Sequence, residues 1–299
     1  MTKPHSTVQG TLVAVVPCII WSAAVLVMNR LSIPFGPLRA AGLELGVAGA
    51  ILFIAAGIRG SASRIWGHSP RCLSLCGLFW SLNLILSWLA FASVTSSGEL
   101  LVAGLLNYLW PSLTLLIAIP ILGKRMNWLL GPGLAAAFAG IILGKIATAP
   151  DDATTDALMR INVVAYSLAV LDALAWALYS NLSRKLSNPN GASAVPLYML
   201  VTSALLLIMS SSIEAPSNAA FSDWLLLMVW AVATAVAYLC WDIGMRFGNV
   251  VTISTMSMFI PLFSTIITAV ISGHLLSPLL LFAAGLVVVG SAICRRGVV

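Results

Sequence analysis

Long apolar runs recur along almost the whole chain, and they constrain its fold more than any other feature. A helix that crosses a bilayer needs about 20 mostly apolar residues. The breaks between the runs carry proline, glycine and charged residues, as in residues 33–37 and 188–191. The sequence therefore predicts an all-α integral membrane protein with ten transmembrane helices, at roughly 9–29, 36–58, 71–93, 97–120, 128–148, 160–183, 193–213, 222–245, 249–271 and 277–294.

The composition excludes a soluble fold. Of the 299 residues, 60% are hydrophobic and 8% are charged, whereas a soluble domain carries roughly 25% charged residues. The net charge of +6 is explained by basic loops at a membrane surface and needs no nucleic acid. We therefore expect a protein that contacts the lipid bilayer and has no nucleic-acid partner.

No pattern of reactive side chains points to catalysis. The five cysteines lie in or beside apolar runs, and Cys72 and Cys76, one helical turn apart, make an incomplete metal site. The three histidines are scattered, and the Gly-x-Ser-x-Gly, His-Glu-x-x-His and phosphate-loop motifs are absent from the sequence. We expect no enzyme activity, no metal and no cofactor.

The basic residues fix an orientation. With the N-terminus in the cytoplasm, eleven basic residues fall on the inner side and four on the outer side. This bias predicts that both termini are cytoplasmic. The inner residues are Lys3, Arg59, Arg64, Arg71, Lys124, Arg125, Arg184, Lys185, Arg246, Arg295 and Arg296, and the outer ones are Arg30, Arg39, Lys145 and Arg160.

Two weak internal sequence similarities, which we call echoes, align the halves of the chain. Five predicted helices separate the copies, and an odd number reverses the direction of the second copy in the membrane. The sequence therefore predicts two inverted repeats, residues 1–150 and 151–299. The echoes pair Trp21 with Trp176, Pro34 with Pro189 and Gly36 with Gly191, and then Pro111 with Pro261, Gly123 with Gly273 and Gly140 with Gly290.

The paired prolines Pro111 and Pro261 fall inside the fourth and ninth predicted helices. A proline inside a helix removes a backbone hydrogen bond and bends the helix. Freed carbonyl groups are tolerated in a membrane where they face protein or a wet cavity. We expect the two bends to shape a transport pathway, with packing kinks as the alternative.

Two acidic residues lie deep in predicted helices. Asp172 is about 18 Å from the outer end of its helix and Glu44 about 12 Å from the end of its own. Carboxyl groups at such depths face a cavity or a partner. Asp172 and Glu44 are therefore candidates for proton coupling or for binding a substrate ammonium group, whereas Asp242 with Arg246 indicates a local ion pair.

One stretch carries a resemblance to a known family. It reads Asn107-Tyr108-Leu109-Trp110-Pro111-Ser112. With the deep aromatic residues and Gly248-Asn249-Val250, it resembles the EamA-type branch of the drug/metabolite transporter superfamily, and within it the YddG-type aromatic amino acid exporters. The resemblance implies export of aromatic and other hydrophobic amino acids across the bacterial inner membrane, by alternating access around a central cavity. The expected lining residues are Trp21, Asn107, Tyr108, Trp110, Trp176, Tyr179, Tyr238 and Trp241.

The chain also departs from that branch. Gly123-Lys124 and Gly273-His274 stand where Gly-Glu pairs are common in the branch, so a mechanism that uses those glutamates does not transfer. The alternatives are a multidrug, metabolite or nucleotide-sugar carrier of the same superfamily, an enzyme acting on lipid, and a non-transporting membrane subunit. No obligate protein partner is predicted.

Overall fold

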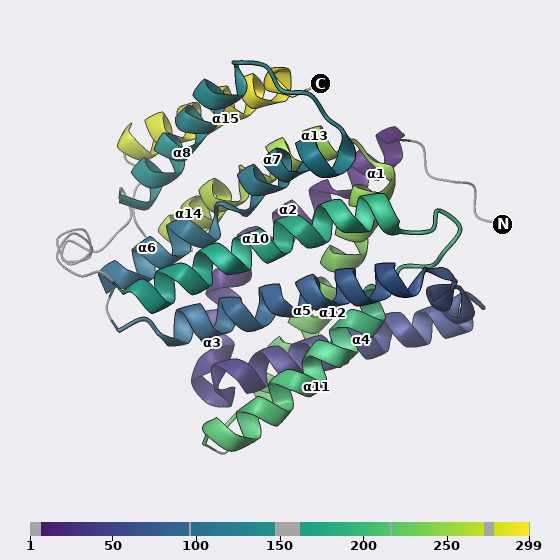
Figure 1. The fold of residues 1–299 in the computed structure, drawn as a ribbon. Coiled ribbons are helices and arrows are strands. Elements are labelled where there is room, and N and C mark those ends of the chain that lie inside the picture. Colours follow the sequence, from purple (N-terminus) through teal and green to yellow (C-terminus); the bar gives the residue numbers. More distant parts are fainter. Residues whose placement is uncertain (1–6, 96, 147–161, 216, 272–277, 299) are drawn as a thin grey trace.

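The computed structural model describes residues 7–95, 97–146, 162–215, 217–271 and 278–298. Over these residues the secondary structure is helical, and the helices pack as one bundle (Figure 1). Five helices are long and apolar enough to cross a membrane, and the bent run through α1, α2 and α3 gives a sixth. The prediction of an all-helical membrane fold is confirmed. The five long helices are α4 (Pro37–Ile58), α5 (Pro70–Ala92), α10 (Val163–Leu186), α11 (Val195–Ile213) and α12 (Phe221–Phe247).

Most of the remaining helices are shorter, and several are parts of a broken run. They coincide with the other predicted windows. Five or six helices of the described chain are long and apolar enough to cross a membrane, so the count of ten crossings stays a prediction. A short 3-10 helix, η1 (Ala62–Gly67), joins α4 to α5. These helices are α1 (Thr7–Val13), α2 (Val15–Ser22), α3 (Ala24–Phe35), α6 (Ser97–Asn107), α7 (Trp110–Leu122), α8 (Leu130–Ile146), α13 (Val250–Ser257), α14 (Ile260–Ile271) and α15 (Pro278–Gly297).

Both paired prolines stand at a break between two helices. Pro111 is the second residue of α7, and Pro261 is the second residue of α14. Neither proline has an N–H to donate to the carbonyl group four residues earlier, and its ring crowds that carbonyl. The chain closes tight turns instead, with Leu109 N–H donating to the Leu106 carbonyl and Phe259 N–H donating to the Met256 carbonyl, each at 3.1 Å.

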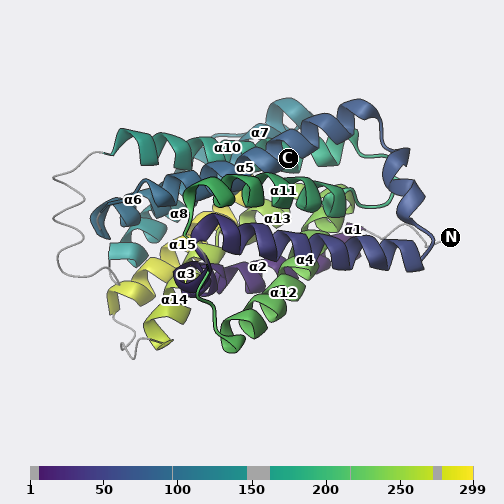
Figure 2. The same cartoon turned by 90° about the horizontal axis from the view of Figure 1, so that it is seen from below.

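Three helix pairs bring together distant parts of the chain: α5 with α10, α4 with α11, and α8 with α15. The pair α8 and α15 lies at one edge of the bundle (Figure 1), and α4 and α11 lie side by side in both views (Figure 2). Glycine allows the closest approaches, since a Cβ on Gly290 of α15 would collide with the Ala137 backbone nitrogen of α8.

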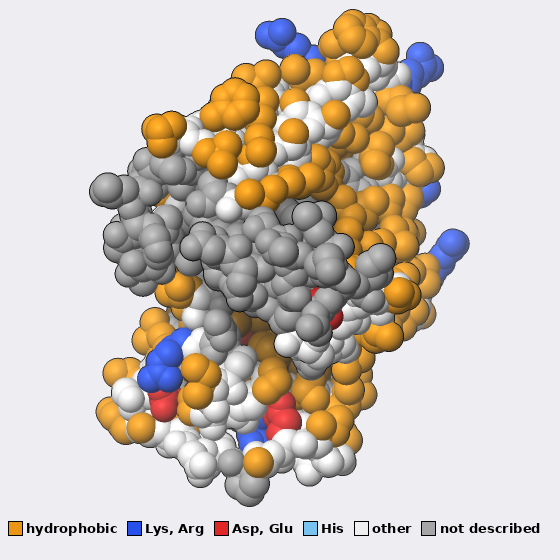
Figure 3. Space-filling view, turned by 90° about the vertical axis from the view of Figure 1, so that its left-hand side faces the viewer, with side chains coloured by type: hydrophobic (Ala, Val, Ile, Leu, Met, Phe, Trp, Pro, Cys, Tyr) orange, Lys and Arg blue, Asp and Glu red, His pale blue; other side chains and the backbone are white. Residues whose placement is uncertain are grey.

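The two ends of the bundle differ in charge. The start of α1, the end of α15 and the connections from α4 to α5 and from α10 to α11 lie at the right-hand ends of their helices in Figure 1. We call this the basic end, because it carries Arg59, Arg64, Arg71, Lys124, Arg125, Arg184, Lys185, Arg246, Arg295 and Arg296. The other end, called the opposite end, faces the viewer in Figure 3 and shows few charged side chains over its described part.

Some predicted residues lie outside the described part. These are Lys3 on the predicted inner side, the boundary between the two predicted repeats at 150/151, Arg160 on the predicted outer side, and Gly273-His274 of the second echo.

Candidate functional site

Five aromatic side chains meet at the centre of the bundle, and we call them the ring cluster. Trp21 comes from α2, Trp110 from α7, Trp176 from α10, and Tyr238 and Trp241 from α12. The Trp21 ring lies 5.3 Å between centroids from both Tyr238 and Trp241, and 5.5 Å from Trp176. Most of these contacts are edge-to-face, the geometry that aromatic pairs favour. Residues far apart in the sequence therefore form one continuous aromatic surface.

Three further rings extend the cluster toward α5 and α11. Tyr179 stacks at a tilt on Trp176, with 5.2 Å between centroids, and Trp80 lies 5.3 Å from Tyr238. Tyr198 of α11 contacts the Tyr179 ring at 6.3 Å. The sequence does not single out Tyr198, because it lies in the first turn of its helix, where an aromatic residue resembles an interface anchor.

The ring cluster holds hydrogen-bond donors that nothing in the described structure uses. The indole Nε1 atoms of Trp80 and Trp176 are buried without a hydrogen-bond partner, whereas Trp241 Nε1 donates to Ser180 Oγ at 3.2 Å. A buried indole N–H normally finds an acceptor. The two unpaired donors are therefore available to an acceptor on a bound molecule.

Asp172 lies beside the ring cluster in a fully hydrogen-bonded setting. It is completely buried on α10, and its two carboxylate oxygens accept hydrogen bonds from the side-chain amides of Asn83 on α5 and Asn107 on α6. These bonds tie three helices together. Asn107, a predicted lining residue, donates its side-chain amide to Asp172. Asn83 is the second partner of Asp172, and sequence spacing does not reveal it.

Glu44 is the second deep acid, and it faces a cavity. Its carboxylate accepts a hydrogen bond from the Thr234 hydroxyl at 2.6 Å. The cavity measures about 70 Å³ and lies against the ring cluster, since Trp21 and Tyr238 line both. Ligand pockets usually measure about 300–1,000 Å³, so an aromatic amino acid needs the surrounding rings to move. The other lining residues are Ala24, Met28, Ala41, Leu45, Leu84, Trp88 and Trp230.

The motif from Asn107 to Ser112 spans the break between α6 and α7. Asn107 ends α6 and turns toward Asp172, Tyr108 is buried at the break, and Trp110 begins α7 and joins the ring cluster. Pro111 fixes the turn that separates them. Pro261 occupies the matching second position of α14, where the neighbouring residues are Ile260 and Leu262 rather than aromatic residues.

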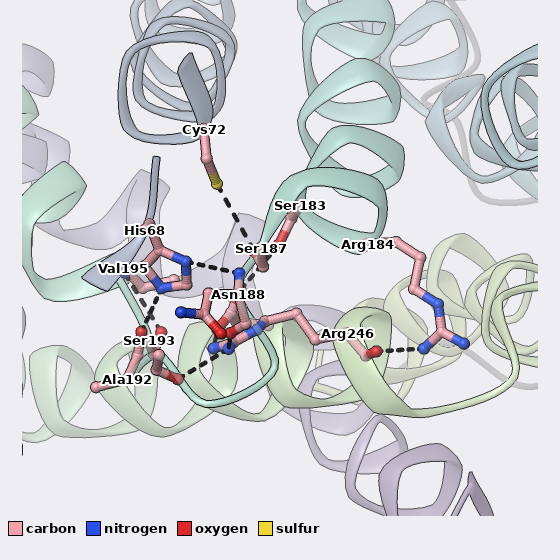
Figure 4. A network of polar contacts seen from close by, with 12 residues as sticks. His68, Cys72, Ser183, Arg184, Ser187, Asn188, Ala192, Ser193, Val195 and Arg246 are labelled. Carbon is pink, nitrogen blue, oxygen red and sulfur yellow. Dashed lines mark hydrogen bonds and ion pairs between the residues drawn. The ribbon is translucent and has the colours of Figure 1, made fainter. Parts of the chain in front are cut away.

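A polar network closes the basic end (Figure 4). His68 accepts a hydrogen bond at Nδ1 from the Asn188 N–H at 3.0 Å, and its Nε2 contacts the Ala192 carbonyl at 2.7 Å. Arg246 of α12 donates to the carbonyls of Asn188 and Gly191 at 2.8 and 2.9 Å. The η1–α5 connection, the α10–α11 connection and α12 are thereby joined.

A buried ion pair anchors this network. Arg246 and Asp242 lie 3.3 Å apart on successive turns of α12, and each side chain is 5% exposed. Ser183 of α10 donates to the other oxygen of Asp242, and Arg184 donates to the Arg246 carbonyl. The predicted pair of Asp242 and Arg246 is confirmed, and it also links α10 to α12.

The links described at the opposite end run within two separate groups of helices. In the first group, Arg30 of α3 pairs with Asp223 of α12 at 3.1 Å, and Glu214 beyond α11 accepts from the Leu38 and Arg39 N–H groups of α4 at 2.6 and 2.9 Å. In the second group, the Asn162 amide donates to the Ser93 carbonyl and to Glu99, which joins α10, α5 and α6. The Glu44 cavity lies between these groups, because α3, α4 and α12 line one side and α5 lines the other.

Comparison with known proteins identifies the family. The model of the EamA-like transporter family matches residues 8–144 and again residues 163–296. The chain belongs to the EamA-like transporter family. The resemblance predicted from the Asn107–Ser112 motif is thus confirmed, and family membership points to a transporter rather than an enzyme.

Curated relatives agree with this assignment. The chain is 28% identical to the "Aromatic amino acid exporter YddG" of Escherichia coli (strain K12) over 310 residues, covering 97% of this chain and 99% of that protein. It is also 28% identical to the protein of the same name from Salmonella typhimurium (strain 14028s / SGSC 2262), covering 96% of each. A solved crystal structure matches with a TM-score of 0.78 at 24% identity, over 97% of this chain and 98% of that one, which supports the fold alone.

The structure divides the predicted site residues of this EamA-like transporter into a set of aromatic residues and a set of polar residues. Six predicted rings come together or lie in the same core: Trp21, Trp110, Trp176, Tyr179, Tyr238 and Trp241. Glu44 faces the adjoining cavity, whereas Asn107 and Asp172 bind each other beside it. Within the described residues, no group of three or more His, Cys, Asp or Glu side chains could hold a metal ion.

Proposed function

We propose that this chain exports aromatic and other hydrophobic amino acids across the bacterial inner membrane. The observation that carries the proposal is the ring cluster, a central aromatic surface built from α2, α7, α10 and α12. Aromatic side chains of a substrate pack favourably against such a surface. Two relatives matched over nearly their whole length, both named as aromatic amino acid exporters, support the same substrate class.

We further infer that the chain consists of two inverted five-helix repeats, residues 1–150 and 151–299. Three observations support this. The family model matches once in each half. The helix breaks before Pro111 and Pro261 recur at the same spacing. The packing is also reciprocal between the halves: α10 of the second half packs on α5 of the first, and α1 and α2 of the first half pack on α12 of the second. The ring cluster then lies near the middle of the membrane, where such transporters hold their substrate.

The basic end is the cytoplasmic end in this proposal, by the excess of Lys and Arg in cytoplasmic loops, and both termini are cytoplasmic. The network of Arg246, His68 and the α10–α11 connection then closes the cytoplasmic side. The Glu44 cavity lies toward the other side, between two groups of helices. Alternating access requires the cytoplasmic network to open while the two outer groups close together.

Asp172 acts as a tie between helices in this proposal. Both of its carboxylate oxygens are hydrogen-bonded to asparagine amides, so a proton or a substrate ammonium group would first have to displace these partners. Replacing a buried, fully satisfied polar contact is costly. Glu44, which faces a cavity, is the better candidate for contact with substrate.

Flux through reconstituted protein tests the proposal. Liposomes containing the purified protein are loaded with labelled tryptophan, phenylalanine or methionine, and release is followed against protein-free liposomes. We expect release of all three to be faster with the protein, and release of labelled glutamate and lysine to be unchanged. Equal release of tryptophan with and without protein would refute the proposal.

A further inference from the structure

We propose that Glu44 binds the ammonium group of the transported amino acid. The inference rests on the proposed function and names the part of the site that recognises the substrate's charge. The Glu44 carboxylate would accept the ammonium N–H groups, and the side chain of the substrate would extend into the ring cluster.

The first argument is the charge of the cavity. Glu44 is the one acidic residue among the residues that line it, and none of them is Lys, Arg or His. A carboxylate in the membrane interior is expensive without an opposite charge. A bound ammonium group supplies that charge.

The second argument is a contrast with four other acids of the described structure. Both carboxylate oxygens of Asp172, Asp223, Asp242 and Glu214 accept hydrogen bonds or ion pairs from groups of the protein. Thr234 donates to one oxygen of Glu44, and the Trp230 side chain is the other polar neighbour of this carboxylate. A carboxylate has about four lone-pair sites, so Glu44 keeps acceptor capacity for a ligand.

The third argument is the aromatic surroundings. Trp21, Trp88, Trp230 and Tyr238 line the same cavity as Glu44. Rings of this kind attract cations through their π faces, with tryptophan the strongest of the side chains. A carboxylate among four rings therefore suits a primary ammonium group better than a neutral or an anionic group.

The fourth argument is the position of the cavity. Its volume of about 70 Å³ suits an ammonium group with one water, since a water occupies about 30 Å³. Trp21 and Tyr238 belong both to the cavity and to the ring cluster. A molecule held by its ammonium group at Glu44 therefore has the ring cluster directly next to it.

Three related compounds separate the charges of the substrate. Tryptophan has an ammonium and a carboxylate group, tryptamine lacks the carboxylate, and indole-3-propionate lacks the ammonium group. Each is tested as an inhibitor of labelled tryptophan flux in liposomes containing the full chain. We expect tryptamine to inhibit the wild type and indole-3-propionate to inhibit it far more weakly.

The variant Glu44→Gln keeps the size of the side chain and an acceptor for Thr234 but removes the charge. Hydrogen bonds to charged groups contribute about 1.5–3 kcal/mol, so the KM for tryptophan should rise about 10- to 100-fold. Inhibition by tryptamine should be lost. Asp172→Asn is the control for the change of charge, since it makes the same change at the other deep acid. Because it removes one of the two acceptor oxygens used by Asn83 and Asn107, it is tested after it elutes as a single species on size exclusion, and it should then discriminate among the compounds as the wild type does.

Direct binding separates this inference from the proposed function. Binding of labelled tryptamine to the purified protein in detergent is measured for the wild type and for Glu44→Gln, after both elute as single species on size exclusion. Binding by the wild type and its loss in Glu44→Gln support the inference even if tryptophan flux is absent. If Glu44→Gln binds tryptamine as the wild type does, or if the wild type does not bind it, the inference is wrong.

Discussion

The two ends of the bundle are held together in different ways. At the basic end, hydrogen bonds and an ion pair join α12 to α10 and to the α10–α11 connection. At the opposite end, the described links stay within two groups of helices, with the Glu44 cavity between them. The difference indicates that the basic end is closed by specific polar contacts, and that the route to the ring cluster starts from the opposite end.

Burial sharpens the comparison. The Arg246 and Asp242 side chains at the basic end are each 5% exposed. Arg30 at the opposite end is 56% exposed where it pairs with Asp223. Water weakens an exposed ion pair, whereas a buried charge depends on its partner. The basic end should therefore be far more sensitive to the loss of a charge.

The largest effect is expected from Arg246→Ala. Removing one partner of a buried pair leaves an unpaired buried charge and costs about 3–5 kcal/mol. Arg30→Ala at the opposite end should cost about 0–1 kcal/mol, because Arg30 is exposed to water and Asp223 keeps its hydrogen bond from the Ala220 N–H. The free energy of unfolding of the purified variants in detergent, measured with denaturant, checks both values. Similar losses for the two variants would contradict the difference between the ends.

The next effect concerns Gly36 and Gly191, the matched glycines of the internal echo. A Cβ on Gly191 would lie 2.7 Å from the His68 ring, and a Cβ on Gly36 would lie 2.7 Å from the Glu214 carboxyl. Alanine at either position should cost about 1–3 kcal/mol through crowding. The same unfolding measurement, made on single and double variants, checks this.

The two glycines should differ in how they are rescued. Gly191→Ala should become nearly neutral in a His68→Ala background, since the ring is the close neighbour. Gly36→Ala should stay destabilising in a Glu214→Ala background, because Gly36 has φ +83°, which costs a residue with a side chain about 1–2 kcal/mol. Equal rescue at both positions would show that backbone strain does not distinguish them.

Much of the fold was accessible from the sequence, because membrane helices and proline breaks are local features. The apolar windows coincide with the observed helices, and the breaks fall at Pro111 and Pro261. The aromatic residues of the site were also predictable, since the deep positions of Trp21 and Trp176 follow from the helix boundaries. Their convergence into one cluster depends on how the helices pack, which no local pattern specifies.

The roles of the deep acids were not accessible from the sequence. Asp172 and Glu44 both occupy mid-helix positions, so their distance from the helix ends predicts the same roles for both. Asn83, which binds Asp172, lies 89 residues away, and Thr234, which binds Glu44, lies 190 residues away. Only the packing of α5 on α10 and of α12 on α4 distinguishes a satisfied acid from one that faces a cavity.

A smaller effect is expected in chemical access to the two sides of the ring cluster. Met28→Cys lies in the cavity lining, whereas Met245→Cys replaces a fully buried residue near the basic end. With Cys240 changed to serine, a membrane-impermeant thiol reagent added from outside should label Met28→Cys and leave Met245→Cys unlabelled. Excess tryptophan should slow the labelling. If the outside reagent does not label Met28→Cys, the route is not open at the opposite end, and the comparison between the two ends is wrong.

The most direct test of the central claim is tryptophan counterflow through the ring cluster. Liposomes loaded with unlabelled tryptophan are diluted into labelled tryptophan, and uptake of label is compared for the wild type, Trp176→Ala and Trp128→Ala. Trp176 is buried in the cluster, and Trp128 is 79% exposed at the basic end. We predict rapid uptake by the wild type and Trp128→Ala and a large loss for Trp176→Ala. Uptake by Trp176→Ala equal to that of the wild type would contradict the account.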